Sequence, residues 1–277
     1  MIKMNFIQVD QAKCTHCGIC AAVCPGIIGM GENGPQAIRS LCVGCGQCVA
    51  VCPQGALDNK QAPLANQILQ TKKADLDQDT AAQFLRSRRS IRNYQQKAVP
   101  RDKIRQLLDI TRMAPTACNS QGVAYHVIDQ PERLRQIAAV IIDWTESELK
   151  NSLEMAASKY ANHLAMMVEL YRHTGEDVVL RSAPCLIVAM TEKDSYASGR
   201  DNTYISFTYA QLFATSIGLG TCWAGLFEYC AAAGYQPLLS LLSLPENMKI
   251  TSGMMVGYPQ YTYQRLVDRN PLQLTWQ

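Results

Sequence analysis

The sequence is short of charged residues, aromatic rings and histidine. Charged residues make up 18% and aromatic residues 7% of the 277 positions, and histidine occurs four times. The formal net charge is only +3, which is too small to indicate a nucleic-acid partner. The hydrophobic fraction of 48% is equally unlike that of a disordered chain. A chain of this length is expected to form two unequal domains.

Signals for export and membrane insertion are also missing. The first ten residues contain no long apolar core followed by a small-residue cleavage site, so they do not resemble a secretory signal. The longest uncharged stretch, from Asn202 to Phe227, is interrupted by threonine, serine and glycine. This favours a buried helix that leads into a strand over a membrane span. We therefore expect a cytoplasmic protein.

Cysteine, in contrast, is abundant. Twelve cysteines in a chain without an export signal indicate metal or redox chemistry before disulfide bonds. Eight of them lie in two similar runs, CTHCGICAAVCP at 14–25 and CVGCGQCVAVCP at 42–53. Each run contains the C-x2-C-x2-C-x3-C-P spacing of two-cluster bacterial ferredoxins, in which the fourth cysteine of one run binds the other run's cluster.

This spacing predicts two [4Fe-4S] clusters with crossed ligands. Three thiolates in one turn can reach three corners of a cubane, and the fourth corner needs a ligand from elsewhere in the chain. Zinc is the competing interpretation, but a zinc site takes four ligands and would leave one cysteine of each run unexplained. The predicted ligands are Cys14, Cys17, Cys20 and Cys52 for the first cluster and Cys42, Cys45, Cys48 and Cys24 for the second.

Other patterns near the runs, and the remaining histidines, are given plainer interpretations. Gly29–Gly34 matches G-x-G-x-x-G, but it lies between cluster runs without a preceding strand, so we interpret it as a loop. His16 lies between two predicted ligands and is interpreted as solvent-facing or as a neighbour of the cluster. His126, His163 and His173 are scattered without a paired nucleophile, so hydrolytic chemistry is not indicated.

The composition turns polar after the second run, which places a domain boundary there. We predict a ferredoxin-like domain over 1–60, a linker over 61–78 and a larger domain over 79–277. In the larger domain, helical and strand-like segments alternate, as in an α+β or α/β domain with helices packed on a sheet, and we expect the α+β class. We expect helices near 80–88, 101–113, 131–142, 147–172, 202–218 and 234–243, and strands near 123–129, 184–191, 220–224 and 250–257.

A run of cations opens the larger domain. Residues 86–94 read RSRRSIRNY. Arginine presents a planar fork of donors that grips phosphate oxygens, and a serine hydroxyl can complete such a site. Taken alone, a basic run of this kind is equally well explained as a solvated surface.

Four segments together resemble the nitroreductase family. RRSIRNY resembles the family's opening flavin motif, and APTACNSQ at 114–121 follows where the family shows A-P-S-x-x-N-x-Q. GLGTCWAG at 218–225 resembles the segment that passes the flavin ring, and GYP at 257–259 precedes Arg265 and Arg269. The resemblance extends over residues 80–277.

The resemblance implies an FMN-binding α+β domain that forms a homodimer with FMN at the interface. Arg88 is expected near the FMN phosphate, and Arg92 near the pyrimidine edge, where a cation favours electron uptake. The full set of implied contacts is Arg88, Arg89, Ser90 and Arg92, then Thr116, Ala117, Asn119 and Gln121 from the neighbouring subunit, then Trp223, Ala224 and Gly225, and finally Arg265 or Arg269 at the phosphate.

Structural explanations stay open for several of these residues. Asn119 could serve only as a turn residue. Trp223 could belong to the core, and Arg265 and Arg269 could be surface charges. The cysteines outside the two runs have no mutual ligand spacing and are expected to pack as small apolar residues; they are Cys118, Cys185, Cys222 and Cys230.

These expectations define an FMN-dependent oxidoreductase. Electrons from ferredoxin or NAD(P)H would pass through the clusters to FMN and on to an electron-poor acceptor such as a nitroaromatic compound or a quinone. No side chain is predicted to be catalytic, because the cofactors carry the reaction. Two alternatives remain: a non-catalytic electron-transfer module of a larger redox complex, and a specialised flavin enzyme for ene reduction, dehalogenation or flavin fragmentation.

Overall fold

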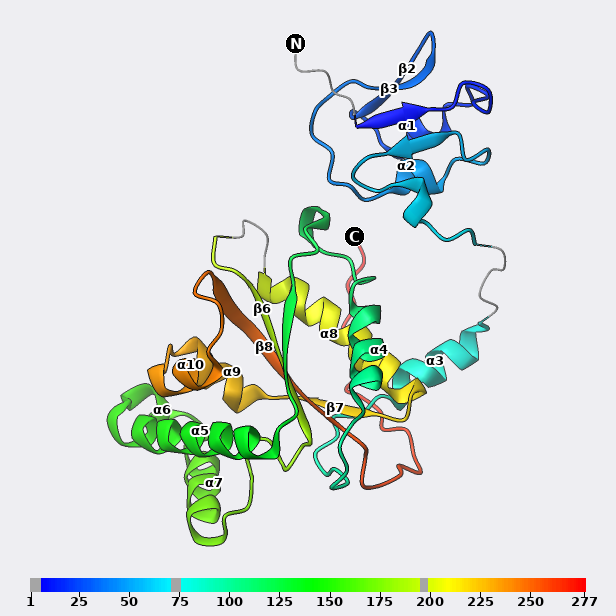
Figure 1. The fold of residues 1–277 in the computed structure, drawn as a ribbon. Helices are drawn as coiled ribbons and strands as arrows, with labels where there is room; N and C mark the ends of the chain where they lie inside the picture. Colours follow the sequence, from blue (N-terminus) through cyan, green and yellow to red (C-terminus); the bar gives the residue numbers. More distant parts are fainter. Residues whose placement is uncertain (1–5, 71–75, 195–198) are drawn as a thin grey trace. The chain divides into compact units, whose positions relative to one another are not determined.

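The computed structural model describes residues 6–70, 76–194 and 199–277, and it divides into two compact units (Figure 1). Met1–Asp75, with which Cys118–Ser120 are grouped, form the smaller unit. Leu76–Ala117 and Gln121–Gln277 form the larger one. The predicted linker lies partly outside the described residues, and its described part contains a short 3-10 turn at Leu64–Asn66.

The smaller unit consists of two antiparallel strand pairs and two short helices. A glycine with positive φ precedes each helix, Gly18 at 73° and Gly46 at 72°, a conformation that glycine adopts without strain. These turns place the first two cysteines of each run in a loop and the third in a helix. The elements are β1 (Ile7–Val9) paired with β4 (Leu57–Asn59), β2 (Ile28–Gly31) paired with β3 (Gly34–Ala37), α1 (Ile19–Val23) and α2 (Gln47–Ala50).

The loop predicted at Gly29–Gly34 is instead a β-hairpin. β2 and β3 pair through to Gly31 and Gly34, and Glu32 and Asn33 form the two-residue turn. The loop prediction was wrong because β2 contains two glycines and a single β-branched residue, so it lacks the composition typical of a strand. The segment is still not followed by a helix that could complete a dinucleotide site.

The larger unit is built on a four-stranded antiparallel sheet in the order β5-β6-β8-β7. Alternate residues of β6 point to opposite faces of this sheet, as strand geometry requires. Leu186 and Val188 belong to one buried cluster, whereas Ile187 and Ala189 belong to another. The strands are β5 (Ala124–Ile128), β6 (Cys185–Glu192), β7 (Gly220–Trp223) and β8 (Met248–Gly257).

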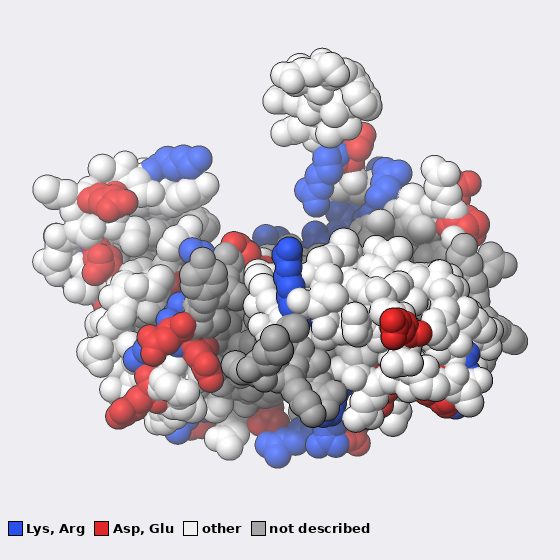
Figure 2. Space-filling model, turned by 90° about the horizontal axis from the view of Figure 1, so that it is seen from above, with Lys and Arg blue, Asp and Glu red and all other residues white. Residues whose placement is uncertain are grey.

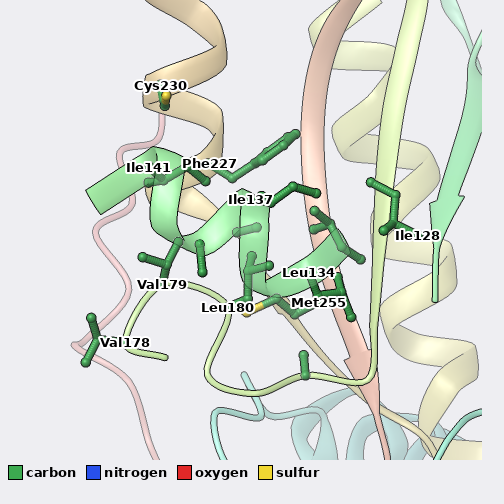
Figure 3. Packing of buried hydrophobic residues seen from close by; sticks show 14 of the residues in the cluster. Ile128, Leu134, Ile137, Ile141, Val178, Val179, Leu180, Phe227, Cys230 and Met255 are labelled. Carbon is green, nitrogen blue, oxygen red and sulfur yellow. The ribbon is translucent and has the colours of Figure 1, made fainter. Parts of the chain in front are cut away.

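Helices cover both faces of the sheet (Figure 1). On one face, α4 (Arg101–Thr111) packs beside α8 (Gly199–Ser216). On the other, α9 (Gly225–Ala232) packs between the sheet and α5 (Pro131–Asn151), and Figure 3 shows Phe227 and Cys230 of α9 beside α5. The remaining helices are α3 (Gln78–Ser87), α6 (Leu153–Ala157), α7 (Ala161–Thr174) and α10 (Gln236–Leu242).

The single helix expected over 147–172 is wrong. α5 continues past residue 142 to Asn151, and α6 and α7 are separate helices. The break has a local cause, because the Ser152 hydroxyl accepts a hydrogen bond from the Met155 N–H at 3.2 Å and so caps a new helix. α9 was not predicted, since Ala224 at its N-cap makes no side-chain cap hydrogen bond and the sequence carries no start signal there.

The surface carries charges of both signs. On the face drawn in Figure 2, basic and acidic side chains are scattered among uncharged residues. No helix among the described residues is both long and apolar enough to cross a membrane.

Candidate functional site

The first predicted cluster set lies around one cavity of the smaller unit. Cys14, Cys17, Cys20 and Cys52 all line this cavity, together with Met30. Cys52 comes from the second run, so the chain does bring the fourth cysteine of one run to the first three of the other. Four thiols around a hollow are a donor set that fits one [4Fe-4S] cluster.

The second set is also gathered, with Cys24 crossing over from the first run. Burial raises the pKa of the Cys24 thiol, and the nearby thiols of Cys48, Cys45 and Cys42 raise it further. Cys24 therefore lies close enough to three cysteines of the other run for their charges to act on it. Within the described part of the chain, no group of three or more His, Cys, Asp or Glu side chains is arranged to hold a single metal ion.

Hydrogen-bond donors approach the sulfur atoms of both sets. The Gly44 N–H donates to Cys42 Sγ at 3.4 Å, and the Ala56 N–H donates to Cys52 Sγ at 3.3 Å. Burial alone would raise the pKa of Cys52, but backbone N–H groups, with Ala56 the strongest, outweigh burial and lower it. Such donors stabilise the thiolate form, which is the form that binds iron. His16 is exposed, as expected.

In the larger unit, the first flavin-type motif lies along the edge of the sheet beside the third. Ser90 forms a parallel bridge with Thr221 of β7, and the Ile91 N–H donates to the Thr221 carbonyl at 2.9 Å. The approach is close enough that a Cβ on Gly220 would lie 2.4 Å from Ile91 Cγ1. Glycine at position 220 therefore permits this contact between the two motifs.

Three arginines lie near enough to the buried thiol of Cys222 to act on its pKa. Burial raises the pKa of this thiol, whereas Arg92, Arg181 and Arg88 act in the opposite direction, as does a hydrogen bond with Ser90. Arg92 and Arg181 also line one polar cavity. Within the described ranges neither Arg88 nor Arg92 forms an ion pair with a carboxylate, so both are available to an anion.

Arg181 was missed by the sequence analysis. It lies in the turn before β6, where it and Ser182 adopt positive φ values of 56° and 52°. The Asp177 carboxylate holds this turn by accepting the N–H groups of Leu180 at 2.8 Å and Ser182 at 3.0 Å. No motif marks the residue, and only the tertiary fold brings it to the first motif.

The first motif also pairs with the fourth. Tyr94 forms an antiparallel bridge with Pro259, and the Gln95 N–H donates to the Tyr258 carbonyl at 2.9 Å. Farther along, the Arg89 guanidinium donates to the Arg265 carbonyl and lies 5.2 Å from the centre of the Tyr263 ring.

Arg89 thus fastens the carboxy-terminal segment to the first motif. Arg265 and Arg269 both lie in this segment and are exposed. The Arg269 N–H donates to the Asp268 carboxylate at 2.9 Å.

The second motif forms a strained turn anchored to α8. The Ala117 N–H donates to Asn202 Oδ1 at 2.9 Å, and the Gln121 N–H donates to Thr116 Oγ1 at 3.0 Å. Asn119 and Gln121 have positive φ values of 52° and 49°. Non-glycine residues in this conformation are strained, and such strain gathers at functional sites.

In the third motif, Trp223 packs against aromatic residues of α8. Its ring lies 5.0 Å from that of Tyr204 and 5.6 Å from that of Phe207, between ring centroids. The Ala224 N–H donates to the Gly253 carbonyl at 2.9 Å. Gly225 is exposed, and a Cβ there would meet nothing within 4 Å, so its backbone is open to a ligand.

The four cysteines outside the two runs differ in burial. Cys185, Cys222 and Cys230 are buried, in agreement with the expectation of apolar packing. The expectation was wrong for Cys118, which is exposed and has a positive φ of 51°. Its place in the turn of the second motif, not a core position, determines its environment.

Comparison with known proteins agrees with both resemblances. The model of the nitroreductase family matches residues 85–258, and that of the 4Fe-4S dicluster domain matches residues 6–57. A Thermus thermophilus protein named NADH dehydrogenase is 26% identical over 191 residues, covering 66% of this chain and 87% of that protein.

Solved structures share the fold of the larger unit. A Bacteroides fragilis nitroreductase with bound FMN has a TM-score of 0.55 at 19% identity, covering 70% of this chain and 97% of that one. Iodotyrosine deiodinase bound to FMN and 3-iodo-L-tyrosine has a TM-score of 0.54 at 18% identity, covering 71% and 98%. The α+β fold class is thereby confirmed. Because the family model covers more than half of the sequence, the chain belongs to the nitroreductase family, and a segment matching the 4Fe-4S dicluster domain precedes the family's fold.

Proposed function

We propose that this protein is an FMN-dependent oxidoreductase that passes electrons from two [4Fe-4S] clusters through FMN to an electron-poor organic acceptor. Nitroaromatic compounds and quinones are the acceptor classes we favour. The observation that carries the proposal is the meeting of three flavin-type motifs, through the Ser90–Thr221 and Tyr94–Pro259 bridges, beside a cavity lined by Arg92 and Arg181. Family membership and the FMN bound by the Bacteroides fragilis nitroreductase support it.

The residues of the first motif fit an anionic, planar cofactor. Arg88 and Ser90 would hold the FMN phosphate, with Arg269 or Arg265 reaching it from the carboxy-terminal segment. Arg92 would lie at the pyrimidine edge, where its positive charge favours reduction. The open backbone at Gly225 would face the ring. When bound, FMN supplies the conversion of a one-electron supply into two-electron chemistry.

The second motif would serve the FMN of a neighbouring subunit in a homodimer. Support comes from the segment after β8, residues 260–277, which contains no helix or strand. Its Leu272 and Trp276 side chains are 84% and 85% exposed. Large apolar side chains at such exposure are expected where a partner covers them. A molar mass of two chains in anaerobic light scattering would support the dimer, and a monomer would contradict it.

We propose two candidate electron donors, a nicotinamide and reduced ferredoxin. The relative from Thermus thermophilus is named NADH dehydrogenase, which favours a nicotinamide donor. The dicluster domain favours reduced ferredoxin. Each is to be mixed separately with oxidised protein while the flavin and cluster absorbance bands are followed.

The decisive experiment is anaerobic purification followed by iron, sulfide and flavin analysis and by acceptor turnover. We expect about eight irons and one FMN per chain, from the ligand count of two cubanes. The reduced protein should be reoxidised catalytically by nitroaromatic compounds or quinones. Zinc in place of iron, or protein without flavin, would contradict the cofactor assignment.

The same acceptor panel separates the two alternatives. Reduction without turnover of any small acceptor would favour an electron-transfer module. Turnover confined to halogenated or activated-alkene substrates would favour a specialised flavin enzyme, a possibility raised by the fold shared with iodotyrosine deiodinase.

A further inference from the structure

A buried amide lies against the sulfur atoms of the second cluster set. Asn59 is the last residue of β4 and is only 1% exposed. Its side-chain nitrogen donates to Cys42 Sγ at 3.6 Å and to Cys48 Sγ at 3.9 Å. Both sulfurs belong to the same predicted cluster. A primary amide carries two N–H hydrogens, so one side chain can serve both sulfurs.

The orientation of this amide is fixed by the backbone. Asn59 Oδ1 accepts the N–H of Gln61 at 2.9 Å. The carbonyl end of the amide is therefore engaged, and the NH2 end must face the sulfurs. The backbone is held as well, because Asp58 Oδ1 accepts the N–H groups of Asn59 and Leu64, each at 2.8 Å.

Asn59 is buried, and its side-chain hydrogen bonds join it to the Gln61 N–H and to the two sulfurs. Cys48, one of the two sulfur ligands that the amide faces, belongs with Val49 and Leu57 to a small buried core. An amide in such a place is costly unless its hydrogens are donated, whereas leucine would fill a similar volume without that cost. Asparagine thus differs from an apolar residue here in two ways: its NH2 group donates to two sulfurs, and its carbonyl oxygen accepts the Gln61 N–H. Of these, only the two N–H···S contacts act on the cluster ligands.

The first cluster set has a different residue at the corresponding position. A glycine with positive φ follows each cysteine run, Gly26 at 79° and Gly55 at 56°. Counted from these glycines, Met30 and Asn59 occupy the same place in the two halves. Met30 lines the cavity of the first set, and a thioether has no hydrogen to donate. The two halves thus differ at one defined donor.

We propose that Asn59 raises the reduction potential of the cluster held by Cys42, Cys45, Cys48 and Cys24 relative to that of the other cluster. Reduction adds one electron, and part of its negative charge resides on the thiolate sulfurs. N–H donors stabilise that added charge, so the reduced state is favoured. No bond is formed or broken, and Asn59 keeps both protons. This contribution favours the second cluster as the site of an electron shared between the two.

The test is potentiometric titration of the anaerobic full-length holoprotein, followed by EPR. In Asn59→Leu and Asn59→Met, one midpoint should fall by about 59 mV, which is about tenfold in a one-electron equilibrium, while the other stays unchanged. Met30→Leu is the matched control at the corresponding position and should move neither midpoint, because neither residue is a donor. Introducing Asn59→Met into Cys45→Ala protein, which keeps only the first cluster, should leave the remaining midpoint unchanged.

The role of Asn59 rests on the proposed cofactors, and the same samples distinguish a failure of the cofactor proposal from a failure of the role of Asn59. Wild-type protein without iron would contradict the proposed function. Wild-type protein with about eight irons whose midpoints match those of both Asn59 variants would overturn the role of Asn59 alone. Equal shifts of both midpoints would overturn it too, as would loss of iron from both variants, since Asn59 would then be needed for assembly.

Discussion

Gly220 is the point at which three flavin-type motifs meet, and an added methyl group there should force them apart. A Cβ at this position would lie 2.4 Å from Ile91 Cγ1 and 2.9 Å from Pro259 Cγ. Gly220 is not among the residues with positive φ, so alanine brings crowding without backbone strain. Overpacking of this kind costs about 1–3 kcal/mol.

The Gly220→Ala variant is therefore expected to be less stable and to hold FMN less tightly. If the full cost falls on the FMN-bound arrangement, the dissociation constant rises by about 5- to 150-fold. Fluorescence titration of FMN measures this change. Urea unfolding followed by tryptophan fluorescence reports on the larger unit alone, because Trp144, Trp223 and Trp276 all belong to it.

A double variant decides whether crowding is the cause. Ile91→Ala removes the nearest atom but leaves a cavity, which lowers the free energy of unfolding by about 2–5 kcal/mol. If Gly220→Ala acts through Ile91, the double variant loses less stability than the sum of the two single losses. Strictly additive losses, or wild-type FMN affinity in Gly220→Ala, would refute the reasoning.

Three further predictions address the clusters, the phosphate site and acid stability. Cys45→Ala should lower iron from about eight to about four per chain and leave FMN bound; unchanged iron would contradict the assignment. Arg88→Ala should weaken FMN retention on dilution, whereas Arg86→Ala, an exposed neighbour, should not. Arg101 lowers the pKa of Asp129 through a 2.9 Å contact. The Arg101–Asp129 ion pair should stabilise the fold by about 0.2–1 kcal/mol at pH values above the ordinary carboxyl pKa, and this stabilisation should be lost as the pH falls through the lowered pKa of Asp129. The free energies of unfolding of Asp129→Asn and wild type should therefore converge in acid.

The parts of the site set by local chemistry could be predicted from the sequence. The gathering of Cys14, Cys17 and Cys20 with Cys52 could be predicted, because three thiols that lie in one turn can face a common point and the spacing itself carries that geometry. The hairpin at Gly29–Gly34 was missed because its strand composition is poor. Arg181 was missed because it lines a cavity with Arg92 only through the packing of the turn before β6 against the first motif. Tertiary contacts of that kind leave no periodic trace in the sequence.

The charge balance of the ferredoxin-like segment is consistent with its proposed role as a tethered electron donor. Residues 1–60 contain four basic and three acidic side chains, namely Lys3, Lys13, Arg39 and Lys60 against Asp10, Glu32 and Asp58. A separate ferredoxin must find its partner by diffusion, and a strong field of one sign raises the rate of that encounter. A domain joined by a short chain has a high effective concentration without such a field. Apart from the negative charge of the two proposed clusters, the segment therefore carries little charge that could steer a partner. Asn59 acts instead on the reduction potential of one cluster, which sets where the electron resides.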